Sequence, residues 1–184
     1  MGAVRTVLGY ADYVTLPNDG KRYEILDGEL SVTPAPGRMH QRAVLSLASA
    51  LDGYVRAHAL GEVNIAPFDV VLSDPTIVQP DILFVAADRS AAFSARGFEG
   101  APTLVVEVLS PGTAHIDRNR KRQLYARHGV PYYWIVDPEA RTVDVYRMGA
   151  AGYEVPQRFG GAVLADLPPF PGLTLDPDPA TVWS

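Results

Sequence analysis

Two pairs of short apolar segments surround turn-forming residues, which is the pattern of β-hairpins. The first pair, residues 23–26 and 29–32, flanks Asp27-Gly28, a dipeptide that suits the positive backbone angles of a tight turn. The second pair, residues 132–136 and 142–146, flanks a turn at residues 137–140. Both regions are therefore predicted to fold as antiparallel pairs of strands.

Three segments have the pattern of helices. Apolar residues recur every three or four positions between Val44 and Val55, which predicts an amphipathic helix over residues 39–58. The charged segment 114–128 predicts a second helix with a basic outer face, and residues 10–16 predict a short one. The long helix is expected to pack one face against a sheet.

The remaining apolar segments predict further strands. Residues 63–65 and 68–72 are expected to form a strand pair or one bent strand, and residues 77–85 another strand. Residues 103–109 are almost continuously apolar, as in a central strand covered on both faces. The proline-rich tail, residues 167–184, is expected to be mostly irregular with one edge strand.

This order of strands and helices predicts an α/β fold. The chain has 184 residues, 47% of them hydrophobic, which is enough for one large domain with a buried core. No internal repeat or linker divides the chain. We therefore expect residues 1–184 to form a single domain with a mixed central β-sheet flanked by helices on both sides.

Composition narrows the chemistry that the protein can carry. Because the chain has no cysteine, a metal can be held only by oxygen or imidazole ligands. The formal net charge of -5 argues against broad, non-specific nucleic-acid binding, but it is compatible with a local basic stripe. No apolar segment has the pattern of a signal peptide or a membrane span, so we expect a cytoplasmic protein without a membrane partner.

Two acids in neighbouring predicted strands are candidates for a metal site. Asp81 opens one apolar strand, and Glu107 lies inside another, next to Val108. A buried carboxylate is costly to desolvate unless it is paired or bound to a metal. Magnesium takes one or two carboxylates, a backbone carbonyl and several waters, so Asp81, Glu107 and the Val108 carbonyl form a suitable set. The alternative is a turn cap at Asp81 and an ion pair at Glu107.

Several short motifs follow one another in a specific order. They are Tyr23-Glu24-Ile25-Leu26-Asp27-Gly28, His40, Pro80-Asp81, Glu107-Val108-Leu109-Ser110-Pro111, the pair Lys121 and Tyr125, and Tyr133-Trp134-Ile135-Val136-Asp137-Pro138. This set resembles the Uma-two family of restriction-endonuclease-like proteins over nearly the whole chain. The resemblance implies the PD-(D/E)xK nuclease fold and magnesium-dependent cleavage of phosphodiester bonds, with manganese as a substitute metal and DNA as the partner.

The resemblance also assigns roles to individual residues. Asp81 corresponds to the first acid of the nuclease motif and Glu107 to the second. The motif has a lysine two positions after the second acid, where this chain has Leu109. In this family the lysine role moves to the following helix, where Lys121 is the matching residue. Glu24 matches the family's early acid, which serves as an auxiliary metal ligand.

Residue spacing alone leaves two interpretations of Lys121 open. It shares a helix face with Asp117 and Tyr125, so its ammonium either points toward the carboxylates or forms a solvated pair with Asp117. Arginines at four nearby positions give the same helix a basic face that can meet a nucleic-acid backbone or simply be solvated. The resemblance favours a catalytic position for Lys121.

Other residues have a functional and a structural interpretation. Glu24 is a metal ligand or one member of a cross-strand charge pair. His40, at the start of the long helix, is a general base, a phosphate contact or a structural histidine. Ser110 follows the strand that carries Glu107, and it is interpreted as a cap or as a donor behind the metal ligands.

Three functions follow from these interpretations. The first is a metal-dependent DNA endonuclease with Asp81 and Glu107 as ligands and Lys121 as an electrostatic catalyst. The second is a catalytically inactive nuclease-fold module that binds nucleic acid or a protein, which the net charge and Leu109 favour. The third is a different phosphoryl-transfer hydrolase. A homodimer would suit cleavage of both strands of a duplex, although no sequence feature marks an interface.

Overall fold

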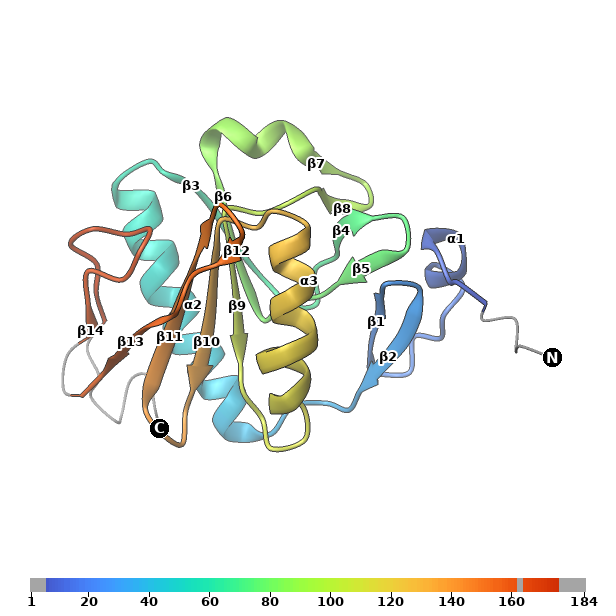
Figure 1. Ribbon diagram of the computed structural model, residues 1–184, viewed down its shortest axis with the longest axis horizontal. Helices are drawn as coiled ribbons and strands as arrows, with labels where there is room; N and C mark the ends of the chain where they lie inside the picture. Colours follow the sequence, from blue (N-terminus) through green and yellow to red (C-terminus); the bar gives the residue numbers. More distant parts are fainter. Residues whose placement is uncertain (1–5, 162–163, 176–184) are drawn as a thin grey trace.

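A central β-sheet runs through the computed structural model, which describes residues 6–161 and 164–175 (Figure 1). Its strands are β3 (Gly61–Ile65), β6 (Ile82–Ala86), β9 (Leu104–Val108), β10 (Tyr132–Asp137), β11 (Thr142–Gly149), β12 (Gly152–Tyr153) and β13 (Gln157–Gly160). They lie in the order β12-β11-β10-β9-β6-β3, and β13 also pairs with β11. Since β9 is parallel to β10 but antiparallel to β6, the sheet is mixed, as predicted.

A second sheet lies beside the first. Its strands are β1 (Arg22–Leu26), β2 (Glu29–Thr33), β4 (Val70–Ser73), β5 (Thr76–Val78), β7 (Phe93–Ser94) and β8 (Gly97–Glu99), in the order β2-β1-β5-β4-β8-β7. The short helix α1 (Tyr10–Tyr13) lies near its β1 and β5 strands. The predicted hairpin is confirmed, with Asp27 and Gly28 at φ angles of 51° and 78° in the turn between β1 and β2.

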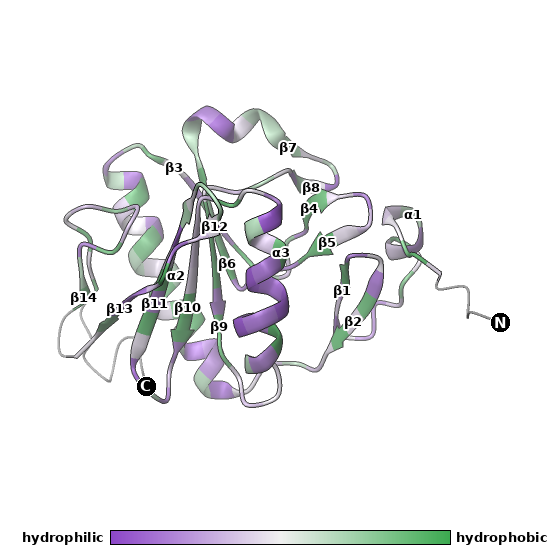
Figure 2. Ribbon diagram, in the orientation of Figure 1, coloured by the Kyte–Doolittle hydropathy of each residue, from purple (hydrophilic) through white to green (hydrophobic). Residues whose placement is uncertain are grey.

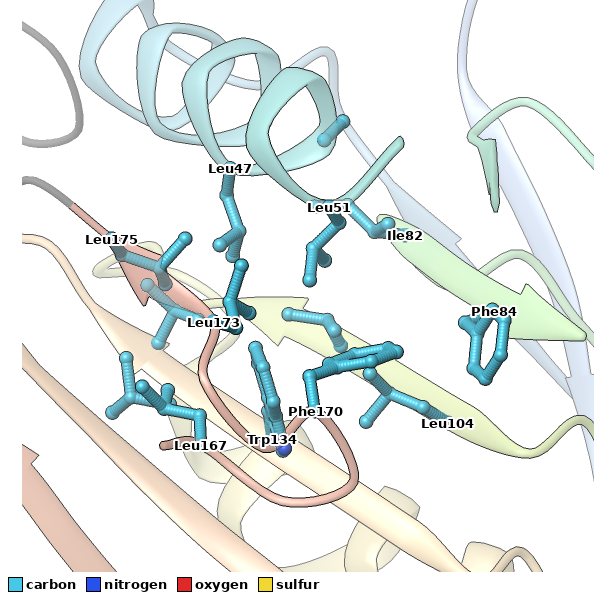
Figure 3. Close-up of a cluster of buried hydrophobic side chains, with 14 of the residues drawn as sticks. Leu47, Leu51, Ile82, Phe84, Leu104, Trp134, Leu167, Phe170, Leu173 and Leu175 are labelled. Atoms are coloured by element: carbon cyan, nitrogen blue, oxygen red, sulfur yellow. The ribbon is translucent and has the colours of Figure 1, made fainter. Parts of the chain in front are cut away.

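Helix α2 (Arg38–Ala57) covers one face of the central sheet. Leu47 and Leu51 pack over Ile82 of β6 and Trp134 of β10 (Figure 3). The segment that leads to β15 (Thr174–Leu175) closes the same core with Phe170, and β15 pairs with β14 (Leu164–Ala165). The predicted edge strand of the tail is therefore present, while residues 176–184 of that tail lie outside the described residues.

A second helical segment covers the opposite face. It begins as a π-helix, η2 (Ile116–Lys121), and continues as α3 (Arg122–Arg127). Leu124 and Tyr125 pack against Val105 and Tyr133 of the strands below. Figure 2 shows the contrast, with a largely hydrophilic helical ribbon in front of mostly hydrophobic strands. Because strand side chains alternate between faces, Glu107 shares the α3 face with Val105.

Two strand predictions are wrong. Residues 77–85 do not form one strand, because the chain passes from β5 in the second sheet to β6 in the central sheet. At the junction Pro80 has no N–H group, and the N–H of Gln79 donates to the Glu24 carboxylate instead of to a strand. Residues 63–65 and 68–72 are neither a strand pair nor one bent strand, since they belong to β3 and β4 in different sheets.

The helix predictions hold with changes in their boundaries. The long helix matches its predicted span within one residue, whereas the first helix is a single turn that ends at Tyr13. The 3-10 helix η1 (Ala87–Ala92) and the short strands after it were not predicted, because segments this short show no periodicity. Within the described ranges, no helix is both long and apolar enough to cross a membrane.

Candidate active site

Asp81 and Glu107 meet where β6 and β9 pair. Ile82 lies opposite Val106 in this antiparallel register, so Asp81, one residue earlier, comes opposite Glu107, one residue later. Both residues are 2% exposed. The N–H of Val108 donates a 2.8 Å hydrogen bond to Asp81 Oδ2, which fixes the acid against the neighbouring strand. The structure thus brings the predicted acid pair together.

Lys121 points toward these acids from the helical segment above them. Its Nζ lies 2.9 Å from Glu107 Oε1, 2.9 Å from Glu24 Oε1 and 3.9 Å from Asp117 Oδ1. The π-helical turn buries Asp117 and Lys121 together, and such wider turns are frequent at functional sites. Lys121 is therefore a buried partner of the carboxylates and not part of a solvated helix face.

Two further predicted residues hold the acids in position. Tyr125 donates a 2.8 Å hydrogen bond from its hydroxyl to Glu107 Oε1. Glu24 Oε1 accepts a 2.8 Å hydrogen bond from the N–H of Gln79, the residue before Pro80-Asp81. Glu24 thereby joins β1 both to Lys121 and to the start of the strand that follows Asp81.

His40 and Arg22 complete the surroundings of Asp81. His40 Nε2 lies 2.9 Å from Asp81 Oδ2, and Arg22 Nη1 donates to Asp81 Oδ1 at 2.8 Å. The other ring nitrogen of His40, Nδ1, is buried and has no hydrogen-bond partner within the described part of the chain. His40 thus contacts one member of the acid pair, while its role stays a prediction.

Sequence reasoning missed Arg22 and did not count Asp117 as a site residue. Arg22 precedes Glu24 by two positions in β1, so the alternation of a strand places both side chains on one face, a signal that was available in the sequence. Asp117 was considered only as an exposed partner of Lys121. The contact between Arg22 and Asp81 joins two sheets, and no local pattern reveals it.

The acids open into a cleft of about 370 Å³. The connection between β2 and α2, residues 34–37, lines this cleft, and so do Ser110, Thr113 and Asp117. The Ser110 hydroxyl lies 2.9 Å from that of Thr113, in the turn that leads into the π-helix. Ser110 therefore lines the cleft through a local turn contact.

The basic face predicted for the helix is largely neutralised by acids. Arg120 pairs with Glu29, Arg127 with Asp27, and Arg118 with Asp137. These contacts fasten the helical segment to the two hairpins. A phosphate backbone that approached this face would have to compete with those carboxylates.

The sequence pattern of the Uma2 (Uma-two) family, described as "Putative restriction endonuclease", matches residues 10–178. The chain belongs to the Uma2 family. A crystal structure of a "putative nuclease belonging to DUF820" from Anabaena variabilis is similar to this Uma2 chain, with a TM-score of 0.72 and 20% identity over 86% of this chain and 87% of that one. This likeness shows that the two chains share a fold. No curated protein matches the chain.

Burial controls the ionisation of the acids in this Uma2 site. It raises the pKa of Glu107 to about 8; Lys121 opposes this shift, and Asp81 adds to it. Burial likewise raises the pKa of Asp117 to about 6 against the effect of Lys121. Burial also disfavours the charged form of Asp81, but His40 and Arg22 outweigh it and lower the pKa of Asp81 to about 2.

The cleft holds more acids than permanent cations. Among its described lining residues, Glu24, Asp81, Glu107 and Asp117 are carboxylic acids, while Arg22 and Lys121 carry permanent positive charges. An additional cation would counter the burial and the repulsion from Asp81 that together raise the pKa of Glu107. Within the described residues, no three His, Asp or Glu side chains form a ready metal-ligand set. A metal here would therefore need a backbone carbonyl and waters besides two carboxylates, which suits magnesium.

Proposed function

We propose that this protein is a divalent-metal-dependent endonuclease that hydrolyses phosphodiester bonds in DNA. The proposal rests above all on Asp81 and Glu107, which face each other across paired strands with Lys121 Nζ 2.9 Å from Glu107. The nuclease descriptions of the family and of the similar crystal structure support the same reaction.

Asp81, Glu107 and the Val108 carbonyl are the proposed ligands of magnesium, for which manganese can substitute. When bound, the metal supplies a Lewis acid for the phosphate and makes a bound water more acidic. The excess of carboxylates in the cleft supports a divalent cation. Glu24 Oε1 accepts hydrogen bonds from Lys121 and Gln79, so Glu24 is proposed to hold Lys121 in place beside the metal ligands and to serve as an auxiliary ligand.

Lys121 supplies a fixed positive charge. Burial favours its neutral form, but Glu107 and Glu24 outweigh burial and raise the pKa of Lys121, so the ammonium stays protonated at neutral pH. A preorganised cation beside the reacting phosphate stabilises the charge that develops in the transition state. The argument for an inactive binding module rested on the net charge and on Leu109. A lysine that reaches Glu107 from the next helix answers the second point, because it supplies the cation that position 109 lacks.

His40 and Tyr125 are proposed to position the two acids. His40 contacts Asp81 Oδ2 from helix α2, and Tyr125 donates to Glu107 Oε1 from helix α3, so each carboxylate is held by a side chain from a helix. Groups that orient metal ligands in this way commonly affect both the affinity for the metal and the catalytic activity.

A cleavage assay tests this proposal. Supercoiled plasmid DNA is incubated with magnesium or manganese and with wild type, Glu107→Gln, Asp81→Asn or the control Asp144→Asn, whose acid lies in a separate ion-pair cluster. We expect roughly 1,000-fold slower cleavage for the two site variants, because each loses a charge that holds the metal. Circular dichroism checks that each variant is folded. Equal cleavage by wild type and Glu107→Gln would refute the proposal.

A further inference from the structure

Arg22 donates a hydrogen bond to one oxygen of Asp81, a proposed metal ligand. Its Nη1 lies 2.8 Å from Asp81 Oδ1, and its side chain is 19% exposed. The other oxygen, Oδ2, accepts from the N–H of Val108 and contacts His40 Nε2. Both oxygens of Asp81 are therefore engaged by groups of the protein, and Arg22 holds Oδ1.

The two oxygens of Asp81 differ in how firmly they are held. Oδ2 is fixed by a backbone group of β9, which cannot move without disturbing the strand pairing. Oδ1 is held by the end of a long side chain from β1, in the other sheet. A guanidinium and a divalent cation both bind carboxylate oxygens and repel each other at close range, so they compete for Oδ1.

We propose that Arg22 is a resident cation on Asp81 that is exchanged for the metal: it neutralises Asp81 Oδ1 in the metal-free protein and leaves that oxygen when the metal binds. This inference rests on the proposed function. It implies that the wild type binds the metal less tightly than a variant with the same acids and no arginine at position 22.

The exchange also gives Arg22 a second position in the cleft. Once displaced, its guanidinium still lies among the residues that line the cleft, because its strand does not have to move. The planar fork of a guanidinium matches two phosphate oxygens, so the displaced side chain is suited to contact a phosphodiester. Arg22 thus couples occupation of the metal site to preparation of the substrate site.

Calorimetric titration of Mn²⁺ into three proteins tests the exchange. Arg22→Gln removes the competing cation, whereas the control Lys21→Gln removes the same charge from the neighbouring residue, which is exposed and paired with Asp19. We expect the dissociation constant of Arg22→Gln to be about tenfold lower than that of wild type. We expect Lys21→Gln to stay within about twofold, because an exposed charge acts only weakly on the site.

The outcomes separate this inference from the proposed function. If wild type and both variants bind no Mn²⁺, the proposed metal site fails. If wild type binds Mn²⁺ and Arg22→Gln binds it equally well or more weakly, only the exchange is overturned. Thermal unfolding in a chelator shows whether Arg22→Gln is folded; if it is not, Arg22→Lys serves instead, with an expected gain of about threefold because ammonium lacks the planar fork.

Discussion

Two clusters of acids in this protein each contain a carboxylate that is almost fully buried, and the clusters differ in charge balance. Asp144 on β11 is 4% exposed, close to the 2% of Asp81. Arg158 contacts both of its oxygens, at 2.6 and 2.8 Å, and Arg118 lies 3.5 Å from Asp144 and 2.9 Å from Asp137. In this cluster two acids, Asp144 and Asp137, thus pair with two guanidinium groups.

In the cleft, four acids meet two permanent cations, and burial leaves Glu107 with a pKa of about 8. The comparison teaches that burial of an acid does not by itself mark a functional site, since an ion-pair cluster also buries acids. An excess of acids in an open cleft is the more informative feature. The Asp144 cluster serves as a structural control for each experiment on the cleft.

After the two acid variants, the largest expected effect in this comparison comes from Lys121. Lys121→Met removes the cation that touches Glu107 and Glu24, and we expect cleavage to slow by about 100-fold, as for loss of a preorganised transition-state donor. The matched control is Arg127→Met, which removes a charge from the exposed side of the same helical segment. Single-turnover cleavage rates measure the difference. A Lys121→Met rate equal to that of Arg127→Met would show that Lys121 only supports the fold.

The pH dependence of stability gives a second contrast. Glu107 has a pKa of about 8 in the folded protein against an ordinary value of 4.5, so the folded state holds its proton more tightly than the unfolded state. The contribution of Glu107 to the free energy of unfolding is therefore complete below pH 4.5 and is lost as the pH rises to 8. The contribution of Asp117 is lost in the same way between pH 3.8, its ordinary pKa, and about pH 6, its pKa in the folded protein. Above pH 6 the remaining decline therefore belongs to Glu107.

Glu107→Gln is neutral at every pH and should remove this decline, which is about 2 kcal/mol between pH 6 and 8 for one buried group. Urea unfolding in a chelator at pH 6, 7 and 8 measures it. Asp144→Asn should keep the decline of wild type, because its cluster is balanced. The same decline in Glu107→Gln as in wild type would assign the proton to another group.

The smallest effect is expected from the structural cluster itself. Asp144→Asn should lower the melting temperature by about 3 °C, because its main partner, Arg158, is largely exposed and its ion pairs are screened. Cleavage should stay within about twofold of wild type, since Asp144 lies outside the cleft. Differential scanning calorimetry and the plasmid assay measure the two quantities. A large loss of activity with unchanged stability would reverse the assignment of the two clusters.

The sequence predicts the acid pair because Glu107 is a single charge in an apolar strand, and such a charge requires a partner. It also predicts the hairpins and the long helix, whose patterns are local. It does not predict Arg22, because the contact with Asp81 spans 59 residues and two sheets. The break between β5 and β6 is hidden for a similar reason, since apolar residues continue on both sides of Pro80 and only tertiary pairing separates them.

The most direct test of the account is the position of the metal. A crystal of the protein soaked in Mn²⁺ should give an anomalous peak about 2.1 Å from carboxylate oxygens of both Asp81 and Glu107, with the Arg22 guanidinium no longer on Asp81 Oδ1. A peak at the Asp137 and Asp144 carboxylates instead, or no peak beside Glu107 in crystals of a preparation that cleaves DNA, would contradict the central claim.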